Sequence, residues 1–319
     1  MAPPFARAGE LAAFNARTIR FEEPGEFARS MTGFDARYLP TTKDHWFSKL
    51  ELPLEGGRMV VVTRPPMLFE GAVAADHGVV TFQLEAGLEA RVNGGSANAD
   101  TIALWKRATD YRGYQQSRLT HCSLFVTDAF STRGWLEPTP GGRMLAIGKD
   151  NSSNLRTCVG DIVRVIRRDP VRTINPNVLK GMEQSIFGSL DETFSNVMLS
   201  PGRLATGRHL ATCRRAREYL RESRFSVQSN IEVAAACDVP VRTLHNAFVS
   251  VLGMSPQKYL LLHRLWSVRE ALLRASVGDL VKSIALDHGF WHLGRFSSVY
   301  QSRFGESPST TLAKRGSIR

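Results

Sequence analysis

Two stretches in the last third of the chain share one pattern, and this repeat constrains the fold more than any other feature. Residues 281–308 read VKSIALDHGFWHLGRFSSVYQSRFGESP, and residues 233–256 read VAAACDVPVRTLHNAFVSVLGMSP. Each stretch has a short apolar helix, a turn, and a second helix whose apolar residues recur at three-and-four spacing. Each closes on Gly-x-Ser-Pro, where glycine accepts a positive φ and Ser-Pro begins a new helix. We therefore expect two helix-turn-helix units in one all-α domain.

The register of the repeat shows where the two units differ. Ala234 matches Ala285 at an offset of 51 residues, whereas Leu244 matches Phe296 at an offset of 52. One extra residue in the second turn explains this slip, so the units share a plan without being identical.

A long helical pattern joins the two units. It runs from Ser255 through KYLLLHRLWSVREALL to about Leu273. A helix of about 19 residues is roughly 28 Å long, close to the ~34 Å between successive major grooves on one face of DNA. Because the second helix of such a unit fits the major groove, one chain would reach two adjacent grooves.

These residues resemble the DNA-binding domain of the AraC/XylS family of bacterial transcription regulators. The resemblance rests on the paired units, Arg264-Leu265 in the joining helix, the IALDHGF turn and the closing FGESP, and it covers about residues 207–315. Two positions depart from the family pattern, because Asp238 replaces a glycine in the first turn and Pro240 replaces a serine or threonine cap. Aspartate tolerates the left-handed conformation better than most residues, and the fixed φ of proline suits entry to a helix.

The resemblance implies a regulator of transcription that binds promoter or operator DNA. By the same resemblance we expect activation more than repression, RNA polymerase as a partner, a homodimer, and control by a small-molecule effector whose identity is unknown. The alternatives are an effector-independent dimeric regulator, an enzyme domain fused to a DNA-binding domain, and a nucleoid protein without sequence preference.

The distribution of charge agrees with a nucleic-acid partner. Residues 201–319 carry 18 Lys and Arg against 8 Asp and Glu, whereas residues 1–200 are near neutral with 23 against 22. A basic domain beside a neutral one is typical of nucleic-acid binding. Charge alone would equally suit a solvated basic face or a membrane-surface patch. The paired helix-turn-helix pattern decides between these interpretations.

The first part of the chain has the pattern of an antiparallel sheet. Between Trp46 and about Val126, short apolar or alternating runs are bounded by Gly, Pro, Asn or Asp: WFSKLEL, RMVVVTR, MLFEGAVA, VVTFQLE, LEARV, TIALW and LTHCSLFV. We therefore predict an α+β chain whose residues 1–150 form a β-rich sandwich or barrel, a common place for a small-molecule cavity. The family resemblance implies a cupin-like sensing domain here.

Two amphipathic helices are predicted next, and we assign residues 151–200 to them. The first has apolar residues from Leu155 to Ile166, and the second runs from Asn175-Pro176 to Ser200-Pro201. Such helices pack either on the sheet of their own chain or on the same pair from another chain. The resemblance implies a dimer contact at this point.

Arg208 to Glu222 form a basic helix that would pack behind the first unit, as the first helix of a DNA-binding domain spanning residues 207–315. Polar residues near the start of each second helix are our candidates for base reading, since Arg bonds guanine and Asn bonds adenine bidentately. They are Arg242, Thr243, His245, Asn246, His292, Gly294, Arg295, Ser297 and Ser298. The candidates for phosphate contact are Arg214, Arg215, Ser255, Lys258, Arg264, Arg303 and Ser307, with an internal salt bridge as the alternative for Arg264 and helix capping as the alternative for the two serines.

Motifs for other functions were not found. No His-x-His with a following Glu, no Gly-Lys-Ser/Thr phosphate loop and no Gly-x-Ser-x-Gly elbow occurs, so we predict no enzyme, no metal and no cofactor. The four cysteines lack Cys-x-x-Cys spacing and are predicted to be buried thiols of a reducing cytoplasm. No apolar run reaches the ~18 residues that span a bilayer, which predicts a cytoplasmic protein without a membrane partner.

Overall fold

The structure of the protein is a computed structural model. It describes residues 18–74, 78–126, 132–135, 142–169, 175–196, 207–223 and 229–315. The chain divides into two compact units. The first comprises the chain up to Tyr38 together with Trp46–Leu204, and the second comprises Leu39–His45 together with Ala205–Arg319.

The first unit contains two β-sheets. The seven-stranded sheet has the order β1 (Ile19–Phe21), β3 (Phe47–Leu54), β4 (Gly57–Arg64), β11 (Leu119–Val126), β6 (Gly78–Gln83), β9 (Thr101–Trp105) and β12 (Arg143–Ala146). The five-stranded sheet has the order β2 (Phe34–Pro40), β5 (Met67–Val73), β10 (Asp110–Gln115), β7 (Glu89–Val92) and β8 (Gly95–Asn98). A short helix, α1 (Pro24–Ser30), lies between β1 and β2 in the sequence. The predicted β-rich region is therefore present.

The seven-stranded sheet is buried on both faces, because side chains alternate between two apolar clusters along each strand. In β4, Met59 and Val61 belong to one cluster, whereas Val60 and Val62 belong to the other. The second cluster also holds residues of the five-stranded sheet, such as Phe69. This double burial explains why the RMVVVTR run is continuously apolar instead of alternating with polar residues.

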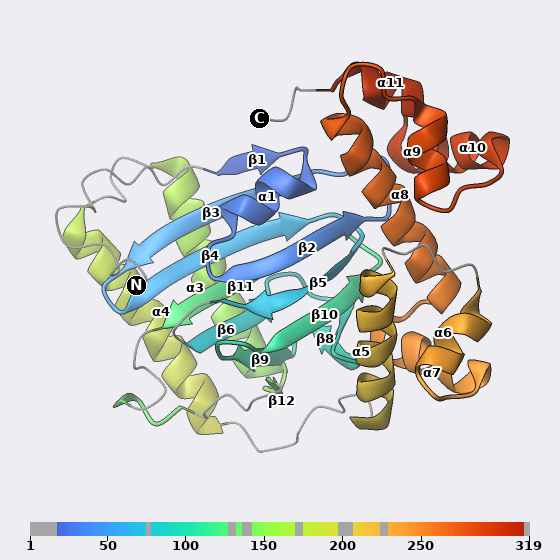
Figure 1. Ribbon diagram of the computed structural model, residues 1–319. Helices are drawn as coiled ribbons and strands as arrows, with labels where there is room; N and C mark the ends of the chain where they lie inside the picture. Colours follow the sequence, from blue (N-terminus) through green and yellow to red (C-terminus); the bar gives the residue numbers. More distant parts are fainter. Residues whose placement is uncertain are drawn as a thin grey trace. The chain divides into compact units, whose positions relative to one another are not determined.

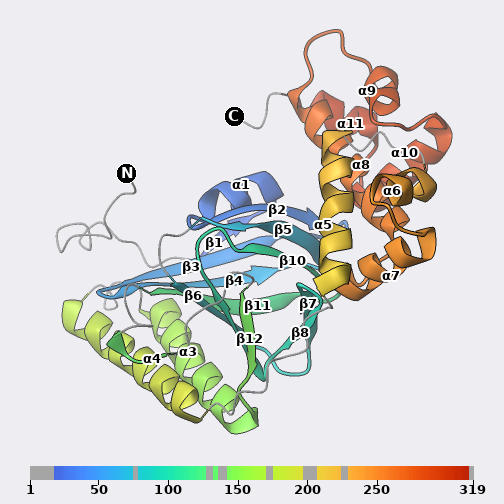
Figure 2. The same ribbon diagram turned by 60° about the horizontal axis from the view of Figure 1, so that its bottom comes forward.

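Two long helices cover the face of the seven-stranded sheet that points away from the second sheet, as Figure 2 shows for α3 (Lys149–Arg168) and α4 (Pro176–Asn196). Leu155, Ile166 and Ile186 are buried in the cluster on that face. Both predicted helices are confirmed, although the predicted end of the second, beyond residue 196, lies outside the described residues. Their apolar stripe is used inside one chain, which is the first of the two packing modes that the sequence left open.

A buried carboxylate fixes α4 to the sheet. Glu183 accepts hydrogen bonds from the backbone N–H groups of Glu55 at 2.9 Å and Gly56 at 2.7 Å, in the turn between β3 and β4. These two bonds satisfy backbone donors of the turn that the strands cannot reach.

The second unit is helical. Its elements are α5 (Gly207–Glu222), α6 (Asn230–Ala236), α7 (Val241–Leu252), α8 (Pro256–Arg274), α9 (Val281–Asp287), α10 (Leu293–Phe304) and α11 (Pro308–Ala313). In Figure 1, α8 joins the pair α6 and α7 to the pair α9 and α10. The two predicted helix-turn-helix units, the basic helix before them and the joining helix are all confirmed, with bounds within three residues of those expected.

The short segment Leu39–His45 belongs to this second unit, which the sequence did not reveal. Trp266 of α8 donates its indole N–H to the carbonyl oxygen of Pro40 at 3.1 Å. The ring of His45 also meets the Trp266 ring edge-on, with 5.6 Å between the ring centroids. Trp266 is thus the centre of this contact.

The described residues offer no group of three His, Cys, Asp or Glu side chains that could hold a metal ion. His45 and His121 are far apart in sequence, and His77 lies outside the described residues. Cys122, Cys213 and Cys237 are buried, Cys158 is half-buried, and all four are free thiols. Within the described ranges, the helices are too short or too polar to cross a membrane.

Candidate nucleic-acid interface

The two turns between helices have the same backbone hydrogen bonds at corresponding positions. The N–H of Val239 bonds to the carbonyl of Ala234 at 3.0 Å, and the N–H of Phe290 bonds to the carbonyl of Ala285 at 3.0 Å. This six-to-one bond is the Schellman ending of a helix. The residue before each bonded N–H has a positive φ, 52° at Asp238 and 79° at Gly289. Aspartate therefore takes the conformation for which the second unit uses glycine, as predicted.

The extra residue of the second unit also lies where the register indicated. Four residues separate α6 from α7, whereas five separate α9 from α10. The additional length places an aromatic side chain, Trp291, in the second turn with 63% of its surface exposed. Trp291 was not among the predicted site residues, although a large aromatic residue in a turn next to a predicted recognition helix was a usable signal.

Helix α7 has one buried face and one polar face. Its buried residues are Leu244, Ala247, Phe248, Val251 and Leu252. Of the predicted base-reading residues, Arg242, His245 and Asn246 are exposed and Thr243 is half-buried. All four lie within the first two turns of the helix, which is the part of a recognition helix that contacts base edges.

Helix α10 has the same division but a poorer polar face. Phe296, Tyr300 and Phe304 are buried in it. Gly294, Arg295, Ser297 and Ser298 are exposed, and His292 stands exposed at the position just before the helix. The hydroxyl of Ser298 donates to the carbonyl of Gly294 at 3.1 Å, inside the helix. Arg295 is therefore the strongest potential base reader on this surface.

The predicted phosphate-binding cations fall into two groups. Arg214, Arg215 and Lys258 have exposed side chains. Arg214 also forms an i,i+4 ion pair with Glu218, with 4.0 Å between Nε and Oε1, and exposed pairs of this kind contribute little.

Arg264 and Arg303 instead lie half-buried within the domain. The guanidinium of Arg264 lies beneath the second turn, where a Cβ added at Gly289 would come within 3.3 Å of Cζ. Burial lowers the pKa of Arg264. Arg303 donates a hydrogen bond to the carbonyl of Thr41. Both arginines have internal contacts in addition to any role on DNA.

Ser255 and Ser307 both cap helices. The Oγ of Ser255 accepts from the N–H of Lys258 at 3.3 Å, and the Oγ of Ser307 accepts from the N–H of Thr310 at 3.1 Å. These bonds begin α8 and α11, whereas α7 and α10 begin without a side-chain cap. The capping alternative therefore accounts for both serines.

The closing FGESP turn contains an ionic cluster around Glu306. Its carboxylate accepts from Arg269 of α8 at 2.6 Å, from Lys314 at 2.5 Å and from the hydroxyl of Thr311 at 2.8 Å. Burial alone would raise the pKa of Glu306, but these hydrogen bonds outweigh burial and lower the pKa to about 2. Glu306 thus links α8 to the end of the second helix-turn-helix unit, a role that was not predicted from the sequence.

Paired helix-turn-helix units with outward polar helices define a DNA-binding domain. In agreement, residues 233–314 match the family model described as a helix-turn-helix domain. The chain is 44% identical over 72 residues to the XylDLEGF operon transcriptional activator of Pseudomonas putida, a match that covers 22% of each chain. It is 40% identical over 82 residues to the probable thc operon regulatory protein of Rhodococcus erythropolis, covering 25% of each. These matches span about a quarter or less of the curated relatives.

A solved structure is also similar in sequence. A probable AraC family transcriptional regulator from Rhodopseudomonas palustris CGA009 is 31% identical, with 33% of this chain and 97% of that chain covered and a TM-score of 0.30. Through its C-terminal domain, the chain belongs to the AraC/XylS family of transcription regulators.

Proposed function

We propose that this protein is a sequence-specific DNA-binding regulator of transcription that contacts two successive major-groove segments with α7 and α10. The carrying observation is the duplicated unit, in which two helices with exposed polar starts are joined by one helix of 19 residues. At roughly 1.5 Å per residue this helix suits the spacing of adjacent grooves. The excess of Lys and Arg in the same part of the chain supplies attraction to phosphate.

The two units would divide the work of recognition. Arg242 and Asn246 give α7 two side chains that can bond bases bidentately, whereas α10 offers one in Arg295. We therefore assign most base choice to the first helix-turn-helix unit. The second helix-turn-helix unit would supply phosphate contacts and a fit to the shape of the duplex.

The rest of the chain would control this activity. Residues 1–150 form a cupin-like effector-sensing domain in this proposal, residues 151–200 contribute the linking helices and a dimer contact, and residues 207–315 bind DNA. Because curated relatives are named as operon activators, activation with RNA polymerase as a partner is the proposed outcome. A small molecule would act only as far as its affinity differs between the competent and incompetent states.

The decisive experiment is selection of DNA from a random pool by the full-length protein, followed by footprinting of the selected sequence. A regulator of this kind yields one motif in two blocks and protects both. Binding of all pool sequences with equal affinity, together with a steep dependence on salt, would instead assign a nucleoid protein. Turnover of a metabolite by the protein would revive the enzyme alternative.

The proposed dimer has its own test. Sedimentation equilibrium of the full-length protein at tens of micromolar should give twice the mass of one chain. A mass of one chain without DNA would contradict the proposed dimer. Since α3 and α4 already bury their apolar stripe in the core, a dimer contact would have to use their outer faces, where Val165 is 48% exposed.

A further inference from the structure

The first compact unit, which contains the two β-sheets, has polar side chains in its interior at positions where a sandwich normally has apolar ones. The alternation that directs Val60 and Val62 between the two sheets directs Arg64 to the same face of β4. In β11 the same face carries His121 and Ser123, while the intervening Cys122 belongs to the cluster under the helices. Histidine spacing in the sequence does not reveal this set of residues, because what they share is the side of each strand that they occupy.

The register of the sheet brings these residues together. His121 of β11 is paired with Gln83 of β6, and Ser123 is paired with Thr81. Arg64 ends β4 on the other side of β11, opposite Leu119. One face of three neighbouring strands therefore presents a cation, an imidazole, an amide and two hydroxyls to the space between the sheets.

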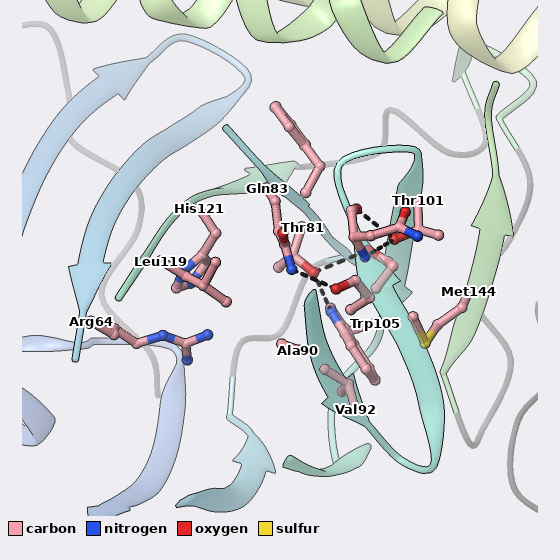
Figure 3. Close-up of a pocket in the computed structure, with 14 residues that line it drawn as sticks. Arg64, Thr81, Gln83, Ala90, Val92, Thr101, Trp105, Leu119, His121 and Met144 are labelled. Carbon is pink, nitrogen blue, oxygen red and sulfur yellow. Dashed lines mark hydrogen bonds between the residues drawn. The ribbon is translucent and has the colours of Figure 1, made fainter. Parts of the chain in front are cut away.

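That space is hollow. Two adjoining compartments of about 60 and 70 Å³ share the lining residues Arg64, Thr81, Val92, Trp105 and His121. A water molecule needs ~10–15 Å³ on this scale, so the compartments together suit a compact molecule on the order of ten non-hydrogen atoms. In Figure 3 the Arg64 side chain extends from its strand toward the centre of the view, with His121 and Leu119 above it and Trp105 beyond.

Polar atoms around the cavity lack partners. Among the described residues, Nε of Arg64, Nδ1 of His121, Oγ of Ser123 and Oε1 of Gln83 are buried without a hydrogen bond. Buried polar groups in proteins are nearly always paired, and those left unpaired at a cavity often meet a ligand or water. The cavity therefore has unused bonding capacity on several of its walls.

Among the described residues that line the cavity, Arg64 is the only Lys or Arg, and none is Asp or Glu. Its guanidinium lies over the Phe69 ring, with 4.5 Å between Cζ and the ring centroid. Burial lowers its pKa, and the nearby phenols of Tyr38 and Tyr111 partly oppose this effect. Burial also raises the pKa of each phenol, so both hydroxyls stay protonated and can donate hydrogen bonds.

His121 adds no second charge. Burial, with the nearby charge of Arg64, lowers its pKa well below the usual value, so the imidazole is neutral at neutral pH. A neutral imidazole can donate one hydrogen bond and accept another. The cavity thus carries a single net positive charge, which matches a ligand with a single negative charge.

The remaining walls are apolar. Val92, Trp105 and Leu119 line the compartment beside Gln83, and Met31, Phe34 and Phe69 line the compartment beside Tyr111. Aromatic and aliphatic walls favour a ligand whose body is compact and apolar.

We propose that this cavity binds a small organic monocarboxylate, with the carboxylate on Arg64 and an apolar body between the two sheets. The hydroxyl of Tyr111 and the imidazole of His121 would complete the contacts of the carboxylate. The inference rests on the proposed function in one respect, because it identifies this ligand class as the effector of the regulator.

The test is binding of isovalerate and cyclohexanecarboxylate to the full-length protein, measured by calorimetry and by the shift in melting temperature. Their amides, isovaleramide and cyclohexanecarboxamide, have the same shape without the charge. The carboxylates should bind one per chain, about tenfold or more tightly than the amides. Equal binding of acid and amide, or no binding of either carboxylate at millimolar concentration, would overturn the proposal. Inorganic phosphate that stabilises the protein as much as the carboxylates would show that the apolar walls take no part.

Arg64→Met separates a binding role from a structural one. The variant should lose carboxylate binding while its unliganded melting temperature stays the same or rises, because it removes a half-buried charge that has no ion-pair partner among the described residues. Arg143→Met is the matched control, since Arg143 lies in β12 of the same unit outside the cavity lining, and it should bind like the wild type. A lower melting temperature with unchanged carboxylate binding in Arg64→Met would assign a structural role and overturn the proposal.

DNA affinity, measured separately with and without isovalerate, distinguishes the two proposals. Carboxylate binding with no change in DNA affinity leaves the site intact and overturns the effector role. Carboxylate binding by a protein that selects no DNA motif overturns the proposed regulator and leaves the cavity assignment standing. A selected DNA motif with no carboxylate binding overturns the cavity assignment and leaves the proposed regulator standing.

Discussion

The two helix-turn-helix units end on the same four-residue turn, and the comparison of these turns shows how one backbone plan is stabilised in two ways. Gly253 and Gly305 have φ of 68° and 74°, and Ser255 and Ser307 cap the helix that follows. The residue between glycine and serine differs. Met254 is 3% exposed in an apolar site, whereas Glu306 forms the ionic cluster with Arg269, Lys314 and Thr311.

The difference follows from what each turn leads into. The first turn leads into α8, a helix of 19 residues that buries side chains around most of its circumference. The second leads into α11, a helix of six residues at the end of the domain, where there is less apolar surface to bury. An ion pair that is shielded from water takes the place of packing.

Removal of the Glu306 carboxylate should have the largest effect, and this effect should depend on pH. Glu306→Ala should destabilise the protein by about 3 kcal/mol at neutral pH, because it removes the carboxylate that pairs with the buried Arg269. The pKa is about 2 in the folded protein and lies near 4.3 in an unfolded chain, so the contribution is complete above about pH 4.3 and is lost as pH falls toward 2. Urea unfolding of the full-length protein at neutral and acid pH measures both values.

Met254→Ala is the matched control for that experiment. It should cost about 2–3 kcal/mol through lost burial, and the cost should be independent of pH. An equal pH dependence in both variants would contradict the assigned role of Glu306.

The next prediction compares the two helix-turn-helix units in DNA binding. Arg242→Ala should weaken binding to the selected DNA by about 1–3 kcal/mol and relax one base position. Arg295→Ala should leave the motif of the first block unchanged. Titration and renewed selection from random DNA measure affinity and motif. An unchanged motif for Arg242→Ala would remove Arg242 from the base-reading set.

A smaller effect tests the turn between α9 and α10. Gly289→Ala should destabilise the protein by about 1–2 kcal/mol, because alanine is strained at a positive φ. The new methyl group would also lie 3.3 Å from the guanidinium carbon of Arg264. Thermal unfolding measures the change, and Gly294→Ala, which has open space around it, is the control expected to show little loss.

The smallest effect tests the turn between α6 and α7. Asp238→Gly should raise stability by no more than about 0.5 kcal/mol, because the relief of the positive φ is offset by the greater freedom of glycine in the unfolded chain. A loss above about 1 kcal/mol would show that the Asp238 side chain itself stabilises the turn.

The helical half of the fold could be predicted from the sequence because its signals are local. Ala234 and Ala285, the capping serines and the apolar spacing of α7 and α10 fix helices and turns within stretches of about 25 residues. The candidate base readers also follow from this spacing, and the structure exposes all of them except the half-buried Thr243.

The sheet was predicted less completely because its signals are not local. Strand β10 reads DYRGYQ, with no apolar alternation, and was missed. Gly113 within it has no room for a side chain, since an added Cβ would lie 2.2 Å from the carbonyl oxygen of Arg91 in the neighbouring strand β7. The two strands before Trp46, β1 and β2, were missed as well, because prolines and charged residues interrupt their pattern.

The inward polar residues and the Glu306 cluster belong to the same class of omission. Arg64, Thr81 and His121 come together only after strands far apart in sequence are paired. Likewise, 37 residues separate Arg269 from Glu306. Neither set has a spacing that a sequence pattern can detect.

The burial of α8 on most of its sides sets a limit on the DNA that such a protein can use. Val268, Leu265, Leu262, Tyr259 and Leu260 are at most 7% exposed, and together they extend around most of the circumference of the helix. Because α8 is packed in this way, we expect it to hold α7 and α10 at a fixed distance and orientation. If α7 and α10 each read one block of the operator, five extra base pairs between the blocks would turn the second block about half a helical turn away. We therefore expect the spacing of the two blocks to be as strictly fixed as the bases within them.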